Sequence, residues 1–334
     1  MLGAHTGLTP QILSYKPPHP PVEEIQPPRD RAFFADPEKK SLLSAATRVK
    51  HLTPYIGIEL QGIQLSKLDK GQRDELALLV AERGVVFFRD QDLDLNGQYK
   101  LFKHYGVQDR DPNQVDPRHV TILGRGGDIC SFEHFSSVFA EFHSDHSFEI
   151  NPTSYTMIRM VKAPEYGGDT VFASQTALFD KLSPTFKKTL QGLHGVHISE
   201  RWRHIRPPVR REHPLIRTHP VTKQQSLFYN PAFVINIAEL KGTEALHILN
   251  FLREHLHSAD DLSVRWQWEA GSVAFWDNRI VTHRAIPGGY KTEERKGKRT
   301  AVYGVKPFWE PGSSLARGAG AVPEVNVKTG LDGF

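Results

Sequence analysis

The sequence contains a single cysteine, Cys130, among its 334 residues. One cysteine excludes an internal disulfide bond and a zinc site built from several cysteines. No apolar run approaches the roughly 20 residues of a membrane-spanning helix, and the first residues lack the basic segment and apolar stretch of a secretion signal. We therefore expect a soluble, cytoplasmic protein in which histidine and carboxylate side chains hold any metal.

The sequence also lacks a large excess of one charge sign, since 42 lysines and arginines face 38 aspartates and glutamates. Nucleic-acid-binding proteins usually concentrate basic residues on one element. The densest basic stretch here, residues 201–217, is interrupted by prolines. It predicts a surface loop or, alternatively, a flap that lends positive charge to an anionic substrate. We expect no nucleic-acid and no membrane partner, and a homo-oligomer is left open.

Several common catalytic motifs are absent as well. The chain has no HExxH, no phosphate-binding P-loop, no GxSxG and no GxGxxG before a helix. These absences remove support for a zinc protease, a nucleotide phosphate site, an α/β-hydrolase and a dinucleotide-binding fold.

Prolines and glycines mark the two ends of the chain. Seven prolines among the first 35 residues predict an extended arm over residues 1–44. A glycine-rich stretch predicts a tail over residues 313–334. No repeat or linker interrupts the sequence between them, so residues 45–312 are expected to form one domain.

Short strand-like runs outnumber helical patterns within this domain. An amphipathic helix over residues 69–84 is followed directly by a buried strand, VVFFRD. Further helices are expected at 98–105, 183–193 and 243–257, and strands at 120–123, 154–161, 226–229, 264–268, 272–276 and 300–305. This pattern predicts a β-rich (α+β) fold with helices packed outside a β core.

The segment FHSD places His143 and Asp145 two residues apart. On an extended strand these positions face the same side, so the two side chains can bind one metal ion. Non-haem Fe(II) oxygenases use two histidines and one carboxylate, which leaves positions open for cosubstrate and oxygen. A hydrogen-bonded surface pair is the alternative, and the metal hypothesis needs a second histidine from elsewhere.

His283 is the candidate for this second histidine. It follows an apolar strand, SVAFW, and a turn at residues 277–279 that returns the chain. Arg295 and Arg299 come soon after, and a guanidinium can bind a carboxylate, such as the distal one of 2-oxoglutarate, through two hydrogen bonds. Two ligands on one strand and one on a distant strand predict a double-stranded β-helix, the jelly-roll core.

Several segments, taken in order, resemble the taurine/sulfonate dioxygenase (TauD/TfdA-like) family of Fe(II)- and 2-oxoglutarate-dependent enzymes, and especially its fungal sulfonate dioxygenase branch. The similarity runs from Val49 to Pro311 and rests on FHSDHSFEINP, EYGGDTVFAS, HPLIRTHPVTKQQSLFYNPAF, WDNRIVTH and RKGKRTAVYGVKPF. The resemblance implies a dioxygenase that uses Fe(II), 2-oxoglutarate and O2. It would oxidise an aliphatic C–H bond of a small anionic substrate, by resemblance an alkyl sulfonate with release of sulfite.

The resemblance also implies roles for individual residues. The implied iron ligands are His143, Asp145 and His283. Thr170 and Arg295 match the positions that hold the distal carboxylate of 2-oxoglutarate, Arg299 matches an arginine that contacts the sulfonate, and Phe233 matches an aromatic residue that lines the pocket. A surface-paired arginine and an ordinary core phenylalanine are the alternatives for the last two.

Two departures from the family pattern concern the substrate. Where sulfonate-using relatives have a sulfonate-binding histidine, this chain has Asp109 and Asp111, which would repel a sulfonate but could accept a hydrogen bond from an ammonium group. After Phe233, residues 234–236 make the expected pocket wall more apolar. These departures favour, as an alternative substrate, a small amino or carboxylic acid that is hydroxylated, desaturated or cyclised.

Two alternatives belong to other functional classes. A zinc or manganese hydrolase could use the same triad of two histidines and one aspartate, but it would not need Arg295. A catalytically silent, cupin-like binding module is the other alternative. Such modules usually lose a metal ligand, and this chain has all three.

Overall fold

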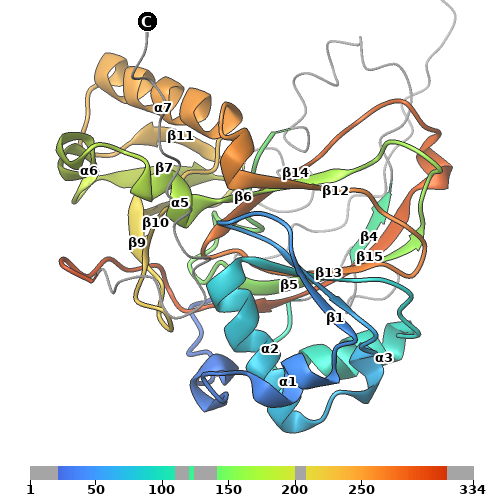
Figure 1. Cartoon of the computed structure of the whole chain (residues 1–334). Coiled ribbons are helices and arrows are strands. Elements are labelled where there is room, and N and C mark those ends of the chain that lie inside the picture. Colours follow the sequence, from blue (N-terminus) through green and yellow to red (C-terminus); the bar gives the residue numbers. More distant parts are fainter. Residues whose placement is uncertain (1–21, 110–119, 124–140, 200–207, 314–334) are drawn as a thin grey trace, which may run out of the picture.

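Two β-sheets face each other in the computed structural model, which describes residues 22–109, 120–123, 141–199 and 208–313 (Figure 1). The larger sheet has seven strands, in the order β1-β2-β3-β13-β5-β15-β4. Their bounds are Arg48–His51, Ile58–Gln61, Val85–Phe88, Val273–Asp277, Thr153–Lys162, Lys296–Tyr303 and Val120–Leu123. The smaller sheet is antiparallel, in the order β12-β6-β14, and its strands are Ser263–Trp266, Thr170–Ser174 and Val281–Ala285.

Strand β3 shows how the larger sheet separates two apolar cores. Alternate side chains of a strand point to opposite faces. Val86 and Phe88 pack into the core between the sheet and its covering helices. Val85 and Phe87 pack into the core between the two sheets, together with Phe172 of β6. A run that is apolar at every position is therefore buried on both faces, as the sequence predicted.

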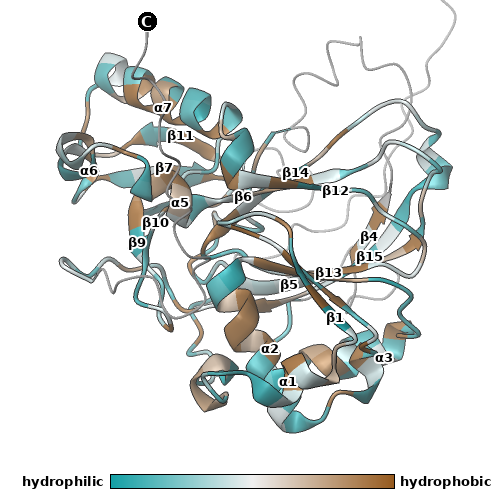
Figure 2. Cartoon of the chain, in the orientation of Figure 1, coloured by the Kyte–Doolittle hydropathy of each residue, from teal (hydrophilic) through white to brown (hydrophobic). Residues whose placement is uncertain are grey.

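Three helices cover the outer face of the larger sheet: α1 (Lys40–Ala45), α2 (Lys70–Arg83) and α3 (Leu95–Phe102). Apolar colours run along β13 and over α2 in Figure 2. Helix α2 begins at a capping box, in which the side chain of Asp69 accepts from the N–H of Gln72 and Gln72 reaches back to the backbone of Asp69. It ends at Gly84, whose φ of +75° favours glycine.

A second layer of helices and short strands extends the smaller sheet. It contains α5 (Gln175–Asp180), α6 (Pro184–Leu190) and α7 (Gly242–His257). A three-stranded sheet, β11-β7-β8, and a pair, β10-β9, accompany them, with bounds Val234–Ile237, His194–Ile198, Arg210–Pro214, Gln225–Leu227 and Ile216–Thr218. Short 3-10 helices lie at Arg31–Phe34, Leu65–Lys67, Asp260–Leu262 and Thr292–Glu294.

The β-rich jelly-roll prediction with external helices is confirmed. The loop predicted for residues 201–217 is wrong from Arg210 on, where β8 and β9 form. Arg217 is buried because its guanidinium stacks 3.8 Å from the ring centre of Phe228 and donates to the main-chain oxygen of Asn278. Across the described ranges, no helix has the length and apolar character needed to cross a membrane.

The described part of the predicted arm packs against the domain instead of remaining a separate extended segment. Leu42 of α1 is fully buried in the core. Asp30 accepts from the hydroxyl of Tyr155 over 2.9 Å and forms an ion pair with Arg279 over 2.7 Å. Core burial of Leu42 and the buried partners of Asp30 stabilise this packed arrangement. Residues 1–21 of the predicted arm lie outside the described residues. The boundaries at residues 45 and 312 stay predictions.

Candidate active site

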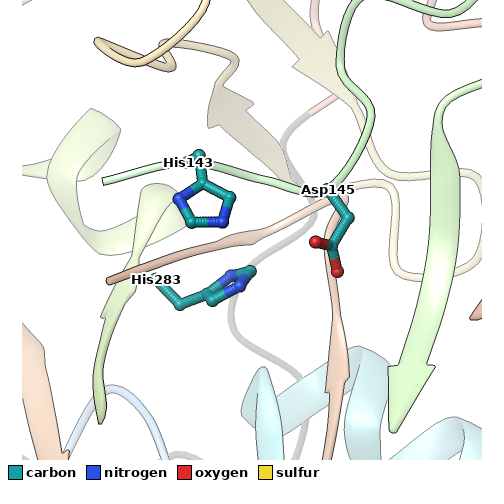
Figure 3. Close-up of side chains that lie close together, drawn as sticks. All are labelled: His143, Asp145 and His283. Atoms are coloured by element: carbon teal, nitrogen blue, oxygen red, sulfur yellow. The ribbon is translucent and has the colours of Figure 1, made fainter. Parts of the chain in front are cut away.

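Two backbone hydrogen bonds join the segments that carry the two candidate histidines. His143 N donates to His283 O over 2.9 Å, and His283 N donates to His143 O over 2.8 Å. His283 belongs to β14, whereas His143 forms an isolated bridge. The regular strand expected through Asp145 is absent, because the chain turns there and His146 has a φ of +49°. Bridge and turn still bring Asp145 beside both imidazoles (Figure 3).

These three side chains make up a metal-sized cluster. One ligand atom from each of His143, Asp145 and His283 lies within 4.8 Å of the others. Burial, reinforced by His143, lowers the pKa of His283 to about 3, and burial also lowers the pKa of His143. Burial opposes ionisation of Asp145, but Arg299 and the imidazoles outweigh it and hold its pKa well below the usual range. Neutral imidazoles and an ionised carboxylate are the forms that bind metal ions.

The ring nitrogens have distinct surroundings. Nδ1 of His143 lies 3.0 Å from the main-chain oxygen of Glu141, an acceptor that fixes the N–H at this position. Nε2 of His143 is thereby left as an electron-pair donor. Nδ1 of His283 is buried and has no hydrogen-bond partner within the described ranges. The donor set therefore fits a divalent metal of the two-histidine, one-carboxylate type.

Arg295 contacts Thr170 of β6, whose partner on β14, Ala285, lies two residues after His283. Arg295 is 2% exposed, and its Nε donates to Gly168 O over 2.7 Å while its Nη2 lies 3.3 Å from Thr170 Oγ1. Trp268 Nε1 donates to the same hydroxyl oxygen over 2.9 Å.

Burial lowers the pKa of Arg295, and Tyr290 and Asp169 only partly offset this. Asp169 forms its own ion pair with Arg265 over 2.6 Å, and no carboxylate of the described residues lies within ion-pair distance of Arg295. This buried cation is suited to an external anion.

Gly168 allows this approach of Arg295. Its φ is +67°, and a Cβ atom there would lie 2.9 Å from Cδ of Arg295. Any side chain at this position would therefore combine an unfavourable backbone conformation with a steric clash. Glycine at position 168, the second glycine of EYGGDT, is thus needed for Arg295 to lie where it does.

Residues 48–301 match the family described as "Taurine catabolism dioxygenase TauD, TfdA family". The chain belongs to this family.

Relatives within the TauD/TfdA family include the alpha-ketoglutarate-dependent dioxygenase cnsP of Penicillium expansum, 34% identical over 90% of this chain and 88% of the relative. An alpha-ketoglutarate-dependent sulfonate dioxygenase of Saccharomyces cerevisiae is 38% identical over 81% and 73%. The crystal structure of a taurine dioxygenase from Burkholderia xenovorans superposes with a TM-score of 0.68 at 30% identity, covering 78% of this chain and 92% of that one. This TauD/TfdA member is accordingly an Fe(II)- and 2-oxoglutarate-dependent dioxygenase.

Arg299, the arginine matched to the sulfonate contact, has carboxylates of the protein beside it. Its Nη1 donates to Asp145 Oδ1 over 2.5 Å, and its Nη2 lies 4.0 Å from Asp109 Oδ2. Asp109 also contacts His146 Nδ1 at 3.1 Å and accepts from the hydroxyl of Tyr303 over 2.9 Å. Burial alone would raise the pKa of Asp109, but His146 and Arg299 lower it to about 2. Asp109 is therefore ionised.

Phe233 also lies at the site, whereas Asp111 falls outside the described residues. The ring of Phe233 is 6.1 Å from that of His143 and 5.1 Å from that of Phe148, both edge-on. It is 5% exposed and directly precedes β11. Phe233 therefore forms an aromatic wall on the His143 side of the cluster.

Sequence reasoning missed the residues that hold the Asp145 loop. Ser144 N donates to Asn230 Oδ1 over 2.8 Å, Asp145 N donates to Asn278 Oδ1 over 3.0 Å, and Thr156 donates to the Asp145 carboxylate over 3.0 Å. Asn278 was recognised only as part of a turn. Its position two residues after the buried Trp276 was the available signal, because a buried turn must satisfy its own polar groups.

Proposed function

We propose that His143, Asp145 and His283 hold Fe(II), that Arg295 and Thr170 bind the distal carboxylate of 2-oxoglutarate, and that the enzyme oxidises an aliphatic C–H bond of a small anionic substrate. The observation that carries the proposal is the cluster of three ligand atoms within 4.8 Å, together with a buried arginine that contacts Thr170, whose strand partner Ala285 lies two residues after His283. A hydrolase with the same triad would have no use for this arginine. The dioxygenase family match likewise favours the oxygenase over a hydrolase or a silent binding module.

Iron would supply redox chemistry, coupling decarboxylation of 2-oxoglutarate by O2 to oxidation of the substrate. The residues of the chain bind and orient. Arg295 would offer its guanidinium to the cosubstrate carboxylate as a charge-assisted hydrogen-bond donor. Thr170 Oγ1 already accepts from Trp268 and lies within reach of Arg295, so its hydroxyl proton is available for the same carboxylate.

The substrate is proposed to be an alkyl sulfonate, in line with the name of the yeast relative. An amino or carboxylic acid is the second candidate, and the charge around Arg299 favours it. Asp145 and Asp109 lie at 2.5 Å and 4.0 Å from this guanidinium, so part of its charge is already neutralised. The carboxylate of Asp109 would repel a sulfonate and attract an ammonium group.

Anaerobic loading with Fe(II), followed by exposure to O2 with 2-oxoglutarate and a panel of alkyl sulfonates and branched amino acids, tests the proposal through release of succinate. We expect succinate release that depends on both metal and substrate. Sulfite release from taurine or isethionate would identify the sulfonate activity, whereas turnover of amino acids alone would favour the second candidate. Metal binding with no succinate from any substrate would contradict the oxygenase.

Variants of the triad test the ligand assignment. His143→Ala, Asp145→Ala and His283→Ala should each lose metal binding and turnover while the protein stays folded, because each removes one of three donors. His247→Ala, an exposed histidine of α7, is the matched control and should behave as wild type. Wild-type activity at low iron in any triad variant would refute the assignment of that residue.

A further inference from the structure

A hydrogen-bonded chain reaches the Asp145 carboxylate from the turn between β13 and β14. Thr156 of β5 donates from Oγ1 to Asp145 Oδ2 over 3.0 Å, and Asn278 Nδ2 lies 2.8 Å from the same hydroxyl oxygen. Thr156 is 0% exposed and Asn278 is 1% exposed. Water therefore does not compete for these groups, and each bond has a fixed partner.

The orientation of the Asn278 amide follows from its neighbours. Its Oδ1 receives two donors that cannot act as acceptors, the backbone N–H of Asp145 at 3.0 Å and the indole N–H of Trp276 at 3.1 Å. On the other side, Nδ2 lies 3.1 Å from the main-chain oxygen of Ser154, which can only accept. A flipped amide would lose all three bonds, so Nδ2 must face Thr156.

This orientation also fixes the Thr156 hydroxyl. Its oxygen accepts from Asn278 Nδ2, so its single proton is directed to the other neighbour, Asp145 Oδ2. A carboxylate in its metal-binding form offers only acceptor oxygens, so it can receive this proton. Asn278 thus determines in which direction Thr156 donates.

The hydrogen bond from Thr156 leaves Arg299 only one oxygen of the Asp145 carboxylate. Arg299 donates to this oxygen, Oδ1, over 2.5 Å. With Thr156 on Oδ2 and Arg299 on Oδ1, each oxygen keeps a second lone pair for a metal. Without Thr156 the carboxylate could turn and offer both oxygens to the guanidinium fork, which binds carboxylates in that way. The guanidinium would then compete with the metal.

We propose that Asn278 and Thr156 are a positioning pair that holds the Asp145 carboxylate in its metal-binding orientation against Arg299. This inference rests on the proposed metal site. The same Asn278 amide lies in the turn before His283, so it joins the segment of the carboxylate ligand to the strand of a histidine ligand.

The chain offers a matched pair of variants. Thr153 and Thr156 are both buried in β5, and both donate to Asp145 over 3.0 Å, but Thr153 donates to the main-chain oxygen and not to the carboxylate. Thr153→Val and Thr156→Val each delete one buried hydroxyl with little change of shape. Calorimetric titration of the metal-free protein with Co(II), without oxygen or cosubstrate, measures metal affinity, and thermal melting of the metal-free protein measures the structural cost.

We expect a larger loss of melting temperature in Thr156→Val than in Thr153→Val, because it removes two hydrogen bonds instead of one. A roughly 10-fold or larger loss of Co(II) affinity is expected only in Thr156→Val, the range typical for partners of metal ligands. Thr156→Ser should restore affinity, because it keeps the hydroxyl. Asn278→Asp should weaken Co(II) binding at least as much, since the new oxygen cannot donate to Thr156.

Equal Co(II) affinity in Thr156→Val, Thr153→Val and wild type would overturn the positioning role, even if Asn278→Asp fails to fold. A failure of the proposed metal site gives a different result. In that case wild-type protein itself binds no Co(II), and the triad variants do not differ from it.

Discussion

The candidate site contains two buried arginines, and they differ in whether a carboxylate of the protein is paired with them. At the proposed cosubstrate end, Arg295 is buried against Gly168 and Thr170 with no carboxylate at ion-pair distance in the described part of the chain. At the proposed substrate end, Arg299 lies between Asp145 and Asp109. A buried cation without a directly paired carboxylate gains much from an anionic ligand, whereas an already paired cation gains less from a further anion. The cosubstrate end should therefore dominate anion binding.

The strongest test of this difference is Arg295→Ala. We expect 2-oxoglutarate to bind the metal-loaded protein at least about 30-fold more weakly, because loss of one partner of a sequestered charge pair costs about 2–5 kcal/mol. Titration calorimetry measures this, and Arg210→Ala, an exposed arginine of β8, serves as control. Unchanged affinity in Arg295→Ala would remove the cosubstrate role from this residue.

A smaller effect is expected from Gly168→Ala, which leaves the arginine in place but pushes it aside. The added Cβ meets Arg295 Cδ at 2.9 Å, so we expect a loss of about 10-fold in 2-oxoglutarate affinity, of the order caused by misplaced orienting groups. Gly289→Ala is the matched control, since φ there is also positive, +77°, but no atom lies within 4 Å of the new Cβ. Equal losses in the two variants would show backbone strain, not displacement of Arg295, to be the cause.

The smallest expected effect concerns the substrate end. Asp109→Asn removes one negative charge near Arg299, so kcat/KM for alkyl sulfonates relative to amino acids should rise by about 3- to 10-fold, the size of a partly screened charge interaction. Tyr303→Phe is the control, because it removes a hydrogen bond to Asp109 without changing charge. If the ratio stays constant in Asp109→Asn, this carboxylate does not select the substrate.

The sequence predicted the strands well where burial on two faces leaves an unbroken apolar run, as in β3 and β13. The grouping of His143, Asp145 and His283, which their residue types suggested, is also found in the structure, while their role as iron ligands stays a prediction. Helix α3 begins earlier than expected, at Leu95, because the side chain of Asp94 caps it. The contact of Thr156 with Asp145 and Asn278 could not be predicted from the sequence. It depends on β5 lying beside the loop of Asp145 and the turn of Asn278, and the turn is more than 100 residues away in the sequence.

The contact between Asp30 and Arg279 bears on where this enzyme can be shortened. Arg279 directly follows Asn278 in the turn, and Asp30 supplies it with a carboxylate while also accepting from Tyr155. A protein trimmed to begin at residue 45 would leave this guanidinium and this phenol without their shared acceptor, under the same turn that orients Asp145. Recombinant versions of the catalytic domain should therefore begin before Ile25, whose backbone N–H is also bound, by Asn151.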